Sequence, residues 1–206
     1  MYIPSAHRID DQDLILELMR QNPFATLVTT VDGVPVATHL PVLIQGGEPM
    51  VIFGHIARQN QQWKAWTPES ESLLIFAGPH GYISPDWYET RPNVPTWNYV
   101  SIHVYGRIQI VEDAEASIAH LAELVKTFDP NLSELQPESM SREYFQKLLP
   151  GIVAFRMEVQ RVDAKAKLNQ NKSEVDRQAI RRRFSTSEDP EQKKMAGLMP
   201  DILPKP

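Results

Sequence analysis

The stretch FATLVTTVDGVPVATHL at residues 24–40 decides the fold class. Its two arms, residues 24–31 and 34–40, are rich in β-branched residues, which favour strands. Asp32-Gly33 between the arms is a strong signal for a two-residue hairpin turn. Pro35 predicts that the second arm lies at a sheet edge or begins a strand, because proline cannot donate a ladder hydrogen bond. The stretch therefore predicts an antiparallel hairpin.

Further short strands and several helices follow along the chain. Strands are predicted at residues 42–44, 50–55, 73–77, 98–111 and 152–162, with Gly106 as a bulge or a point of close backbone approach. Helices are predicted at residues 11–21 (capped by Asp10), 57–66, 113–128 and 141–149, and two more after Ser173. The pattern indicates a mainly β fold with α additions (α+β), built on a closed or nearly closed antiparallel barrel.

The C-terminal part changes character. Residues 173–176 resemble a capping box, and the helix that follows is expected to turn Val175, Ile180 and Phe184 inward. Asp189-Pro190 is expected to start a final short helix, and residues 200–206 read as a frayed tail.

The segment GPHGYISPDWYETRPNVPTWNY at residues 78–99 concentrates aromatic side chains on a backbone that contains four prolines. Because each proline fixes φ and removes a donor, we expect no regular helix or central strand to run through it. Its rings are expected to pack against the barrel, a second subunit or a planar ligand. A long connector tucked onto the core is the alternative.

Composition excludes several classes. The chain has 206 residues, a net charge of −5 and a pI of about 5.7, which argues against a protein that coats nucleic acid. With no cysteine it has no disulfide, thiolate metal site or thiol catalysis, which fits a reducing cytoplasm. The start, MYIPSAHRID, does not read as a signal peptide, and no apolar run is long enough to span a bilayer.

The chemistry-bearing residues leave alternatives open. The six histidines do not form a recognisable metal-binding pattern. His39 and His55 end two strands that could be neighbours. Either of them could be a metal or haem ligand, or they could be hydrogen-bonded residues at the rim of the barrel. A phosphate could bind at residues 55–60, where Arg58 precedes a helix N-terminus, or Arg58 could be a solvated turn residue. The cluster of Arg177 and residues 181–183 could contact DNA phosphates, form a solvated face or make intersubunit ion pairs.

Several blocks together resemble the PaiB-like family, FMN-binding split-barrel proteins described as negative transcriptional regulators. They are MYIPSAHR (1–8), HIARQNQQWK (55–64), GYISPDWYET (81–90), VPTWNYVSIHVYGR (94–107) and KLNQNKSEVDR (167–177). The resemblance implies a split β-barrel domain at residues 1–165 and a C-terminal basic segment with helices at residues 166–206, packed on the barrel or the partner. It also implies a homodimer with FMN at the subunit interface.

The resemblance also implies the cofactor-binding residues. By this resemblance, the strand end at residues 38–41 runs beside the isoalloxazine ring of FMN. The HIARQN block holds the phosphate, with Arg58 as the positive charge and Asn60 and Gln62 as hydrogen-bond donors. The WNY block forms a wall of the site, and the KLNQNK block reaches into it from the end of the barrel or from the partner chain. The residues are Thr38, His39, Leu40, Pro41, His55, Ile56, Ala57, Arg58, Asn60, Gln62, Trp63, Trp97, Asn98, Tyr99, Lys167, Asn169 and Gln170. The arginine run at 181–183 departs from the family pattern.

Four functions remain in competition at this point. The first is an FMN-binding dimer with a regulatory output. The second is a flavin-dependent reductase or oxidase of a small substrate, and the third is a haem-binding or haem-degrading barrel with His39, His55 or His120 as axial ligand. The fourth is a direct DNA binder without a cofactor. Fold alone does not choose between them.

Overall fold

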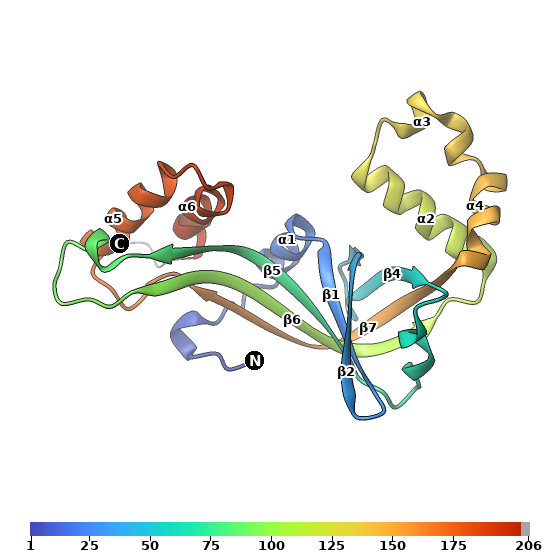
Figure 1. Cartoon of the computed structure of the whole chain (residues 1–206), viewed down its shortest axis with the longest axis horizontal. Helices are drawn as coiled ribbons and strands as arrows, with labels where there is room; N and C mark the ends of the chain where they lie inside the picture. Colours follow the sequence, from blue (N-terminus) through green and yellow to red (C-terminus); the bar gives the residue numbers. More distant parts are fainter. Residues whose placement is uncertain (203–206) are drawn as a thin grey trace. The chain divides into compact units, whose positions relative to one another are not determined.

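The hairpin that residues 24–40 predict is present in the computed structural model of this chain, which describes residues 1–202 (Figure 1). β1 (Phe24–Val31) pairs antiparallel with β2 (Val34–Pro41) along its whole length. Asp32 and Gly33 both have positive φ values, 50° and 79°, as a tight hairpin turn of this kind requires. β2 is the first strand of the sheet, so the edge position predicted from Pro35 is confirmed.

The strands form a seven-stranded sheet in the order β2-β1-β5-β6-β7-β4-β3. The other strands are β3 (Leu43–Gln45), β4 (Val51–Ala57), β5 (Ser72–Ile83), β6 (Thr96–Ile110) and β7 (Ile152–Lys167). The α-helices of the described chain are α1 (Gln12–Gln21), α2 (Ala114–Phe128), α3 (Leu132–Leu135), α4 (Arg142–Leu148), α5 (Glu174–Ser185) and α6 (Pro190–Ile202). β4 pairs antiparallel with both β3 and β7, which agrees with the predicted antiparallel α+β fold.

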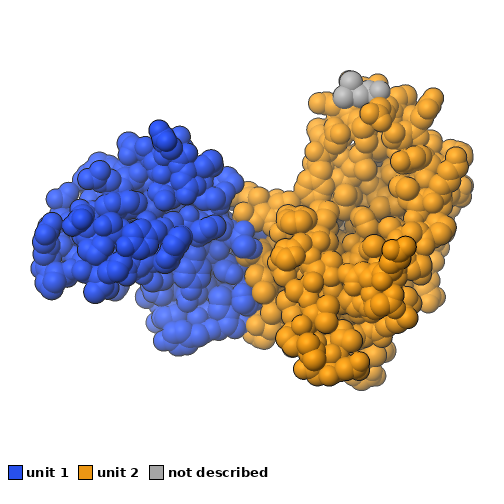
Figure 2. Space-filling view, in the orientation of Figure 1, with its two compact units in different colours: residues 1–19, 77–103, 163–206 blue, residues 20–76, 104–162 orange. Residues whose placement is uncertain are grey.

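The chain divides into two compact units, coloured separately in Figure 2. Unit 2 comprises residues 20–76 and 104–162 and contains the hairpin, β3, β4 and the helices α2 to α4. Its core includes the fully buried side chains Leu27, Ile52, Leu74, Phe76, Phe155 and Met157. Unit 1 comprises residues 1–19, 77–103 and 163–206 and contains α5 and α6. Its core includes Leu18, Met19, Ile83, Ile102, Leu168 and Phe184.

Local capping signals place several helices correctly. The side chain of Asp113 accepts a hydrogen bond from Ala116 N at 2.7 Å, and that of Ser141 from Tyr144 N at 3.2 Å. Ser173 caps α5 in the same way. For α1 the cap is Asp11, whose Oδ1 accepts from two backbone N–H groups, so the prediction of Asp10 was wrong by one residue.

The aromatic segment is shorter than the sequence predicts. β5 continues through Pro79 to Ile83 and β6 begins at Thr96, so the expectation that no central strand runs through residues 78–99 was wrong at the two ends of the segment. The reason lies in the pairing, because β1 pairs only with Ser72–Ile75 of β5. Pro79 lies beyond that ladder and therefore interrupts no hydrogen bond to β1.

Two helix predictions also need correction. Residues 57–66 form only the short 3-10 helix η2 (Gln61–Ala65), because tertiary hydrogen bonds described below fix this backbone. In α5, Ile180 and Phe184 are buried as expected, but Val175 is 57% exposed. Asp176 is buried in its place, because its carboxylate finds hydrogen-bond donors inside the unit. The predicted frayed tail falls partly on residues 203–206, outside the described residues.

Gly106 confirms the predicted close approach and gives the first testable prediction. A Cβ atom at residue 106 would lie 2.3 Å from the carbonyl oxygen of Glu158 on β7. We expect Gly106→Ala to lower the free energy of unfolding by about 3 kcal/mol, because backbone cannot yield as a flexible side chain does. Gly151→Ala is the matched control, since a Cβ there meets nothing within 4 Å. Urea denaturation of both variants measures the difference; equal losses would contradict the steric explanation.

No helix within the described chain is both long enough and apolar enough to cross a membrane.

Candidate functional site

Arg58 lies at the junction where β4 ends and the chain turns toward η2. Its Nε donates to the carbonyl oxygen of Pro150 at 3.0 Å and its Nη2 to that of Ile152 at 2.6 Å. The side chain is solvent-exposed, and within residues 1–202 no carboxylate forms an ion pair with it. The junction therefore holds a cation that is oriented by neutral carbonyl groups and keeps its charge available for an anion.

The backbone around Arg58 is less open than expected. The N–H of Arg58 donates to Gly151 O and that of Asn60 to Ala57 O, both at 2.9 Å. The N–H of Gln62 is used by the Asn60 side chain at 3.1 Å. These three donors of the predicted helix N-terminus are thus engaged within the protein, so the guanidinium of Arg58 is the main candidate for binding an anion here.

Thr38, Asn60 and Gln62 form a polar network that sequence reasoning missed. Thr38 Oγ1 donates to Gln62 Oε1 and accepts from Asn60 Nδ2 at 2.8 Å. Gln62 is only 2% exposed, and its Nε2 donates to the carbonyl oxygens of Leu27 and Val36, both at 3.2 Å. Both amide hydrogens of Gln62 are therefore used, so it has no donor left for a phosphate. It instead fixes η2 to the hairpin.

The strand end predicted to run beside the flavin belongs to an edge strand. Residues 38–41 of β2 pair with residues 24–27 of β1 on one side only, because β2 ends the sheet. His39 is exposed and stacks on Phe24, with ring centroids 6.3 Å apart, whereas Leu40 is buried in the core. Backbone groups at the unpaired edge remain able to bind a polar ring edge, as the prediction requires.

His55 does not lie next to His39 in the sheet, because β4 pairs with β3 and β7 and β2 with β1. It contacts His120 of α2 instead, with His55 Nδ1 3.4 Å from His120 Nε2. Burial lowers the pKa of His55. Burial, and then the nearby His55, lower the pKa of His120 to about 4. The pair is therefore neutral near pH 7, and a spacing of 65 residues hides it from sequence inspection.

The buried pair predicts a pH-dependent stability. His120 titrates with a pKa near 6.5 when unfolded and about 4 when folded, so the unfolded chain binds more protons between these values. The free energy of unfolding should therefore fall by roughly 3 kcal/mol as the pH drops from 7 to 4. Within the described chain, His55 contacts His120, and two charged residues, Arg20 and Glu123, line the same pocket between α2 and residues 42–46.

Urea denaturation at several pH values checks this prediction. In His120→Gln the free energy of unfolding should change less steeply with pH between 6.5 and 4 than in the wild-type protein. His80→Gln removes an exposed histidine and serves as the control for losing one imidazole. If the free energy of unfolding of His120→Gln fell as steeply with pH as that of the wild-type protein, other groups would be responsible for the acid sensitivity.

In unit 1, β6 separates the three residues of the WNY block. Trp97 is 53% exposed, Asn98 is fully buried, and Tyr99 is half-buried with the Lys165 ammonium 5.1 Å from its ring. Alternation along a strand places Trp97 and Tyr99 on one face and Asn98 on the other. Neither polar side-chain atom of Asn98 has a hydrogen-bond partner among the residues that the structure describes. Trp97 and Tyr99 can therefore form a wall, whereas Asn98 points into the interior.

An aromatic cluster of His80, Tyr82 and Trp97 lies in unit 1. The Trp97 ring is 6.1 Å from His80 and 5.8 Å from Tyr82, and Tyr82 is 41% exposed. Its members come from β5 and β6, which shows that part of the predicted aromatic loop is strand.

The KLNQNK block forms a tight turn within unit 1. Asn169 has a φ of 60° and donates from Nδ2 to the Tyr88 hydroxyl at 2.9 Å. Gln170 contacts His7 at 2.9 Å and the N–H of Leu168 at 2.8 Å, and Lys167 donates to Thr96. These three side chains are thus used within the unit, and their predicted contact with the cofactor stays a prediction.

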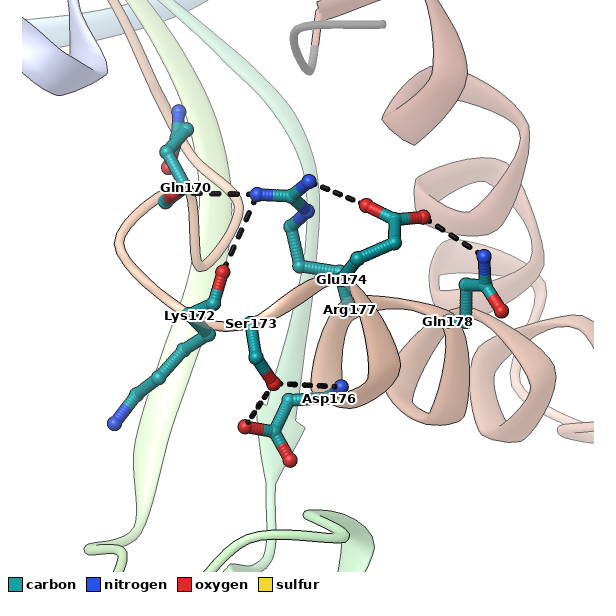
Figure 3. A network of polar contacts seen from close by, with 7 residues as sticks. All are labelled: Gln170, Lys172, Ser173, Glu174, Asp176, Arg177 and Gln178. Carbon is teal, nitrogen blue, oxygen red and sulfur yellow. Dashed lines mark hydrogen bonds and ion pairs between the residues drawn. The ribbon is translucent and has the colours of Figure 1, made fainter. Parts of the chain in front are cut away.

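The turn is joined to α5 by the network in Figure 3. Arg177 donates to the carbonyl oxygens of Gln170 and Lys172 and pairs with Glu174. Asp176 accepts from the Ser173 hydroxyl at 2.8 Å and from the N–H groups of Glu89 and Thr90. Burial alone would raise the pKa of Asp176, but hydrogen bonds from Thr90, Ser173 and Glu89 outweigh it and lower the pKa. The network therefore fixes a charged carboxylate inside the unit.

The predicted site residues fall into two groups. Unit 2 carries Thr38, His39, Leu40, Pro41, His55, Ile56, Ala57, Arg58, Asn60, Gln62 and Trp63, and unit 1 carries Trp97, Asn98, Tyr99, Lys167, Asn169 and Gln170. Within the first group, hydrogen bonds join Thr38, Asn60 and Gln62, and Trp63 Nε1 donates to Arg58 O at 3.1 Å. No group of three or more potential metal ligands occurs within the described residues.

Comparison with solved structures shows the fold class of the chain. The chain matches the flavocytochrome Anf3 from Azotobacter vinelandii with a TM-score of 0.60 at 16% identity, over 76% of this chain and 67% of that one. It matches the FAD and heme binding protein from Mycobacterium smegmatis with a TM-score of 0.60 at 15% identity, over 78% and 73%. At such identities the likeness concerns the fold alone, and it confirms the split-barrel fold.

Sequence comparison then shows the family. The family described as "Putative FMN-binding domain" matches residues 1–161. The "Protease synthase and sporulation protein PAI 2" of Bacillus subtilis (strain 168) is 36% identical over 206 residues, which cover 100% of this chain and 99% of that protein. The chain therefore belongs to this PaiB-like, FMN-binding family, and the expected cofactor, FMN, is the one that the family's description names.

Proposed function

We propose that this chain is an FMN-binding homodimer that acts as a negative transcriptional regulator. The family description supports the cofactor. The name of the Bacillus subtilis relative, "Protease synthase and sporulation protein PAI 2", refers to sporulation, a developmental process that is under regulation, and this supports a regulatory role.

The observation that carries the cofactor assignment is Arg58. It is an exposed guanidinium without a carboxylate partner in the described chain, and two backbone carbonyls orient it. A phosphate monoester placed there gains a charge-assisted hydrogen bond without displacing an internal ion pair. Asn60, which caps η2, has one amide hydrogen beyond its bond to Thr38 and is the second candidate donor.

The flavin ring requires flat apolar walls and a few backbone donors. The unpaired edge of β2 at residues 38–41 offers the backbone groups. Trp97 and Tyr82 offer exposed rings. We infer that pairing of two chains covers these surfaces, because exposed strand edges and aromatic side chains are both stabilised by burial at an interface. The bound flavin would supply any electron transfer.

The arginines of α5 give little support to direct DNA binding. Arg177 is used by the KLNQNK turn, and Arg181 Nε donates to Ala196 O at 3.2 Å. Arg182 lies 3.7 Å from Glu89. Because Arg177 is paired with Glu174 and Arg182 with Glu89, two of the four arginines of α5 present a compensated charge to phosphates. The regulatory output is therefore proposed to pass through a protein or small-molecule partner before it reaches a promoter.

The absorption spectrum of the purified protein tests the cofactor assignment. We expect FMN uptake on titration and a yellow, fluorescent supernatant after heat denaturation. Anaerobic NADH addition distinguishes the oxidoreductase alternative, since bleaching of the flavin band would indicate hydride acceptance. A Soret band would favour the haem alternative, and failure to take up FMN would contradict the proposal.

A further inference from the structure

A cavity of about 360 Å³ lies beside Arg58 within unit 2. Its lining includes residues 110–112, where β6 ends, residues 152–154 of β7, and Ala114 and Ser117 at the start of α2. Asn60, the second candidate donor for a phosphate, is not part of this lining. An anion at Arg58 thus has two candidate positions, one on the α2 side and one on the η2 side, and the cavity favours the first.

The guanidinium of Arg58 keeps unused donors. It carries five N–H groups, and the carbonyl oxygens of Pro150 and Ile152 take two of them, which leaves three (5 − 2). Glu112 lines the same cavity, yet no ion pair joins it to Arg58 within the described part of the chain. The two carbonyls therefore hold the cation in place without neutralising it.

The first turn of α2 has an unused donor beside this cavity. Asp113 caps the helix: its carboxylate accepts from Ala116 N at 2.7 Å, and its carbonyl oxygen accepts from Ser117 N at 3.1 Å. The N–H of Ala114, the first helical residue, has no acceptor among the residues that the structure describes. The first N–H groups of this 15-residue helix carry a partial positive charge, which favours an anion.

Ser117 independently indicates that a polar partner is missing. The residue is only 6% exposed and lines the cavity. Its hydroxyl donates to the carbonyl oxygen of Val111 at 3.4 Å, which is longer than the roughly 2.5–3.0 Å of ordinary O–H···O hydrogen bonds. A buried hydroxyl with so weak a bond gains from a stronger acceptor. Because the hydroxyl can rotate, a phosphate oxygen in the cavity is such an acceptor.

We propose that the phosphate of FMN lies in this cavity, where the N–H of Ala114 and the hydroxyl of Ser117 complete the site whose positive charge is Arg58. The inference rests on the proposed FMN binding and adds two donors from α2. Glu112 lines the same cavity, so its negative charge lowers the affinity for a phosphate. The site therefore combines one cation, two neutral donors and one opposing charge, and a single substitution removes each of them.

Ala114→Pro removes the N–H of residue 114 and little else. Proline is well tolerated at the first helical position, and Asp113 has φ −68° and ψ 121°, which suits a residue before proline. We expect FMN binding to weaken about tenfold and riboflavin binding to stay the same, because only a hydrogen bond to a charged group is lost. Ala114→Val has similar bulk and keeps the N–H, so the difference between the two variants measures the donor itself. Titration of flavin fluorescence gives the affinities.

Ser117→Ala should also weaken FMN binding about tenfold and leave riboflavin binding unchanged, because it removes the second donor. The ratio of the two affinities is the readout, since a general loss of stability would lower both. Ser133→Ala removes an exposed hydroxyl of α3 that lies outside the cavity, and it should change neither affinity.

Glu112→Gln should act in the opposite direction. We expect it to strengthen FMN binding about threefold, because a repulsive charge is removed, and the gain should shrink as salt is added. Glu123→Gln removes another exposed carboxylate, one of α2 that lies outside this cavity, and should leave both flavin affinities unchanged. Weaker FMN binding by Glu112→Gln would contradict the proposed position of the phosphate.

The outcomes separate this inference from the proposed function. If Arg58→Ala lowers the FMN affinity while Ala114→Pro and Ser117→Ala do not, the chain binds FMN but its phosphate lies outside the cavity, which overturns the inference. Asn60→Ser keeps a capping oxygen and removes the amide hydrogens. Loss of the preference for FMN in this variant alone would place the phosphate on the η2 side, with the same consequence. A wild-type protein that binds FMN no better than riboflavin would overturn both the inference and the phosphate role of Arg58.

Discussion

Arg58→Ala is expected to weaken FMN binding by about 100-fold or more while leaving riboflavin binding unchanged within a factor of about three. Riboflavin has the same ring without the phosphate, so only the interaction with the phosphate should disappear. Titration of flavin fluorescence with wild-type and variant protein measures both affinities. The comparison isolates the phosphate contribution from any general disturbance of the ring site.

Two controls sharpen this prediction. Arg156→Ala removes another exposed arginine of unit 2, one that binds Gln109 Oε1 at 2.8 Å, and should leave FMN affinity unchanged. The free energy of unfolding of Arg58→Ala should fall by only about 1 kcal/mol, because the lost hydrogen bonds are solvent-exposed. Equal losses of FMN and riboflavin affinity would show that Arg58 supports the ring site and not the phosphate.

Asp176→Ala is expected to lower the free energy of unfolding by about 3 to 5 kcal/mol. The carboxylate accepts from two backbone N–H groups, those of Glu89 and Thr90, and from the hydroxyls of Thr90 and Ser173. Alanine leaves the buried donors without a partner and removes the link between α5 and the segment after η3 (Pro85–Trp87). Urea denaturation measures the loss.

Asp176→Asn should lose much less, about 1 kcal/mol. Its amide oxygen can accept from the two N–H groups, and the hydroxyls of Thr90 and Ser173 can rotate to accept from its amide hydrogens. Asp86→Ala, which removes an exposed carboxylate 3.9 Å from Arg91, is the control and should be nearly neutral. If Asp176→Ala were as mild as Asp86→Ala, the network would not hold α5 in place.

Acid should remove the same stabilisation. The folded pKa of Asp176 lies below the ordinary value of 3.8, so its contribution is present above that value and is lost as the pH falls through the folded pKa. This window lies below that of His120, whose effect is complete near pH 4. The two groups can therefore be separated in one pH series.

Sequence reasoning succeeded where structure is set by near neighbours. Asp32-Gly33 determined the hairpin, and Asp113 and Ser173 determined where α2 and α5 begin. In each case the deciding hydrogen bond or backbone conformation involves residues at most three positions apart. The family motifs added the cofactor, which no local pattern contains.

Sequence reasoning failed where the local structure depends on residues that are distant in the sequence. The continuation of β5 through Pro79 depends on how far β1 extends along it. The 3-10 helix η2 depends on carbonyls of Leu27 and Val36, and the burial of Asp176 on donors more than eighty positions away. The His55–His120 pair likewise joins a strand to a helix. Polar residues in the sequence do not reveal which of them will meet.

Sedimentation velocity with detection at the visible flavin band tests the central claim most directly. The account predicts that added FMN sediments with the protein as a dimer, with one flavin per chain. Flavin that remains at the meniscus, or that travels with a monomer, would contradict it.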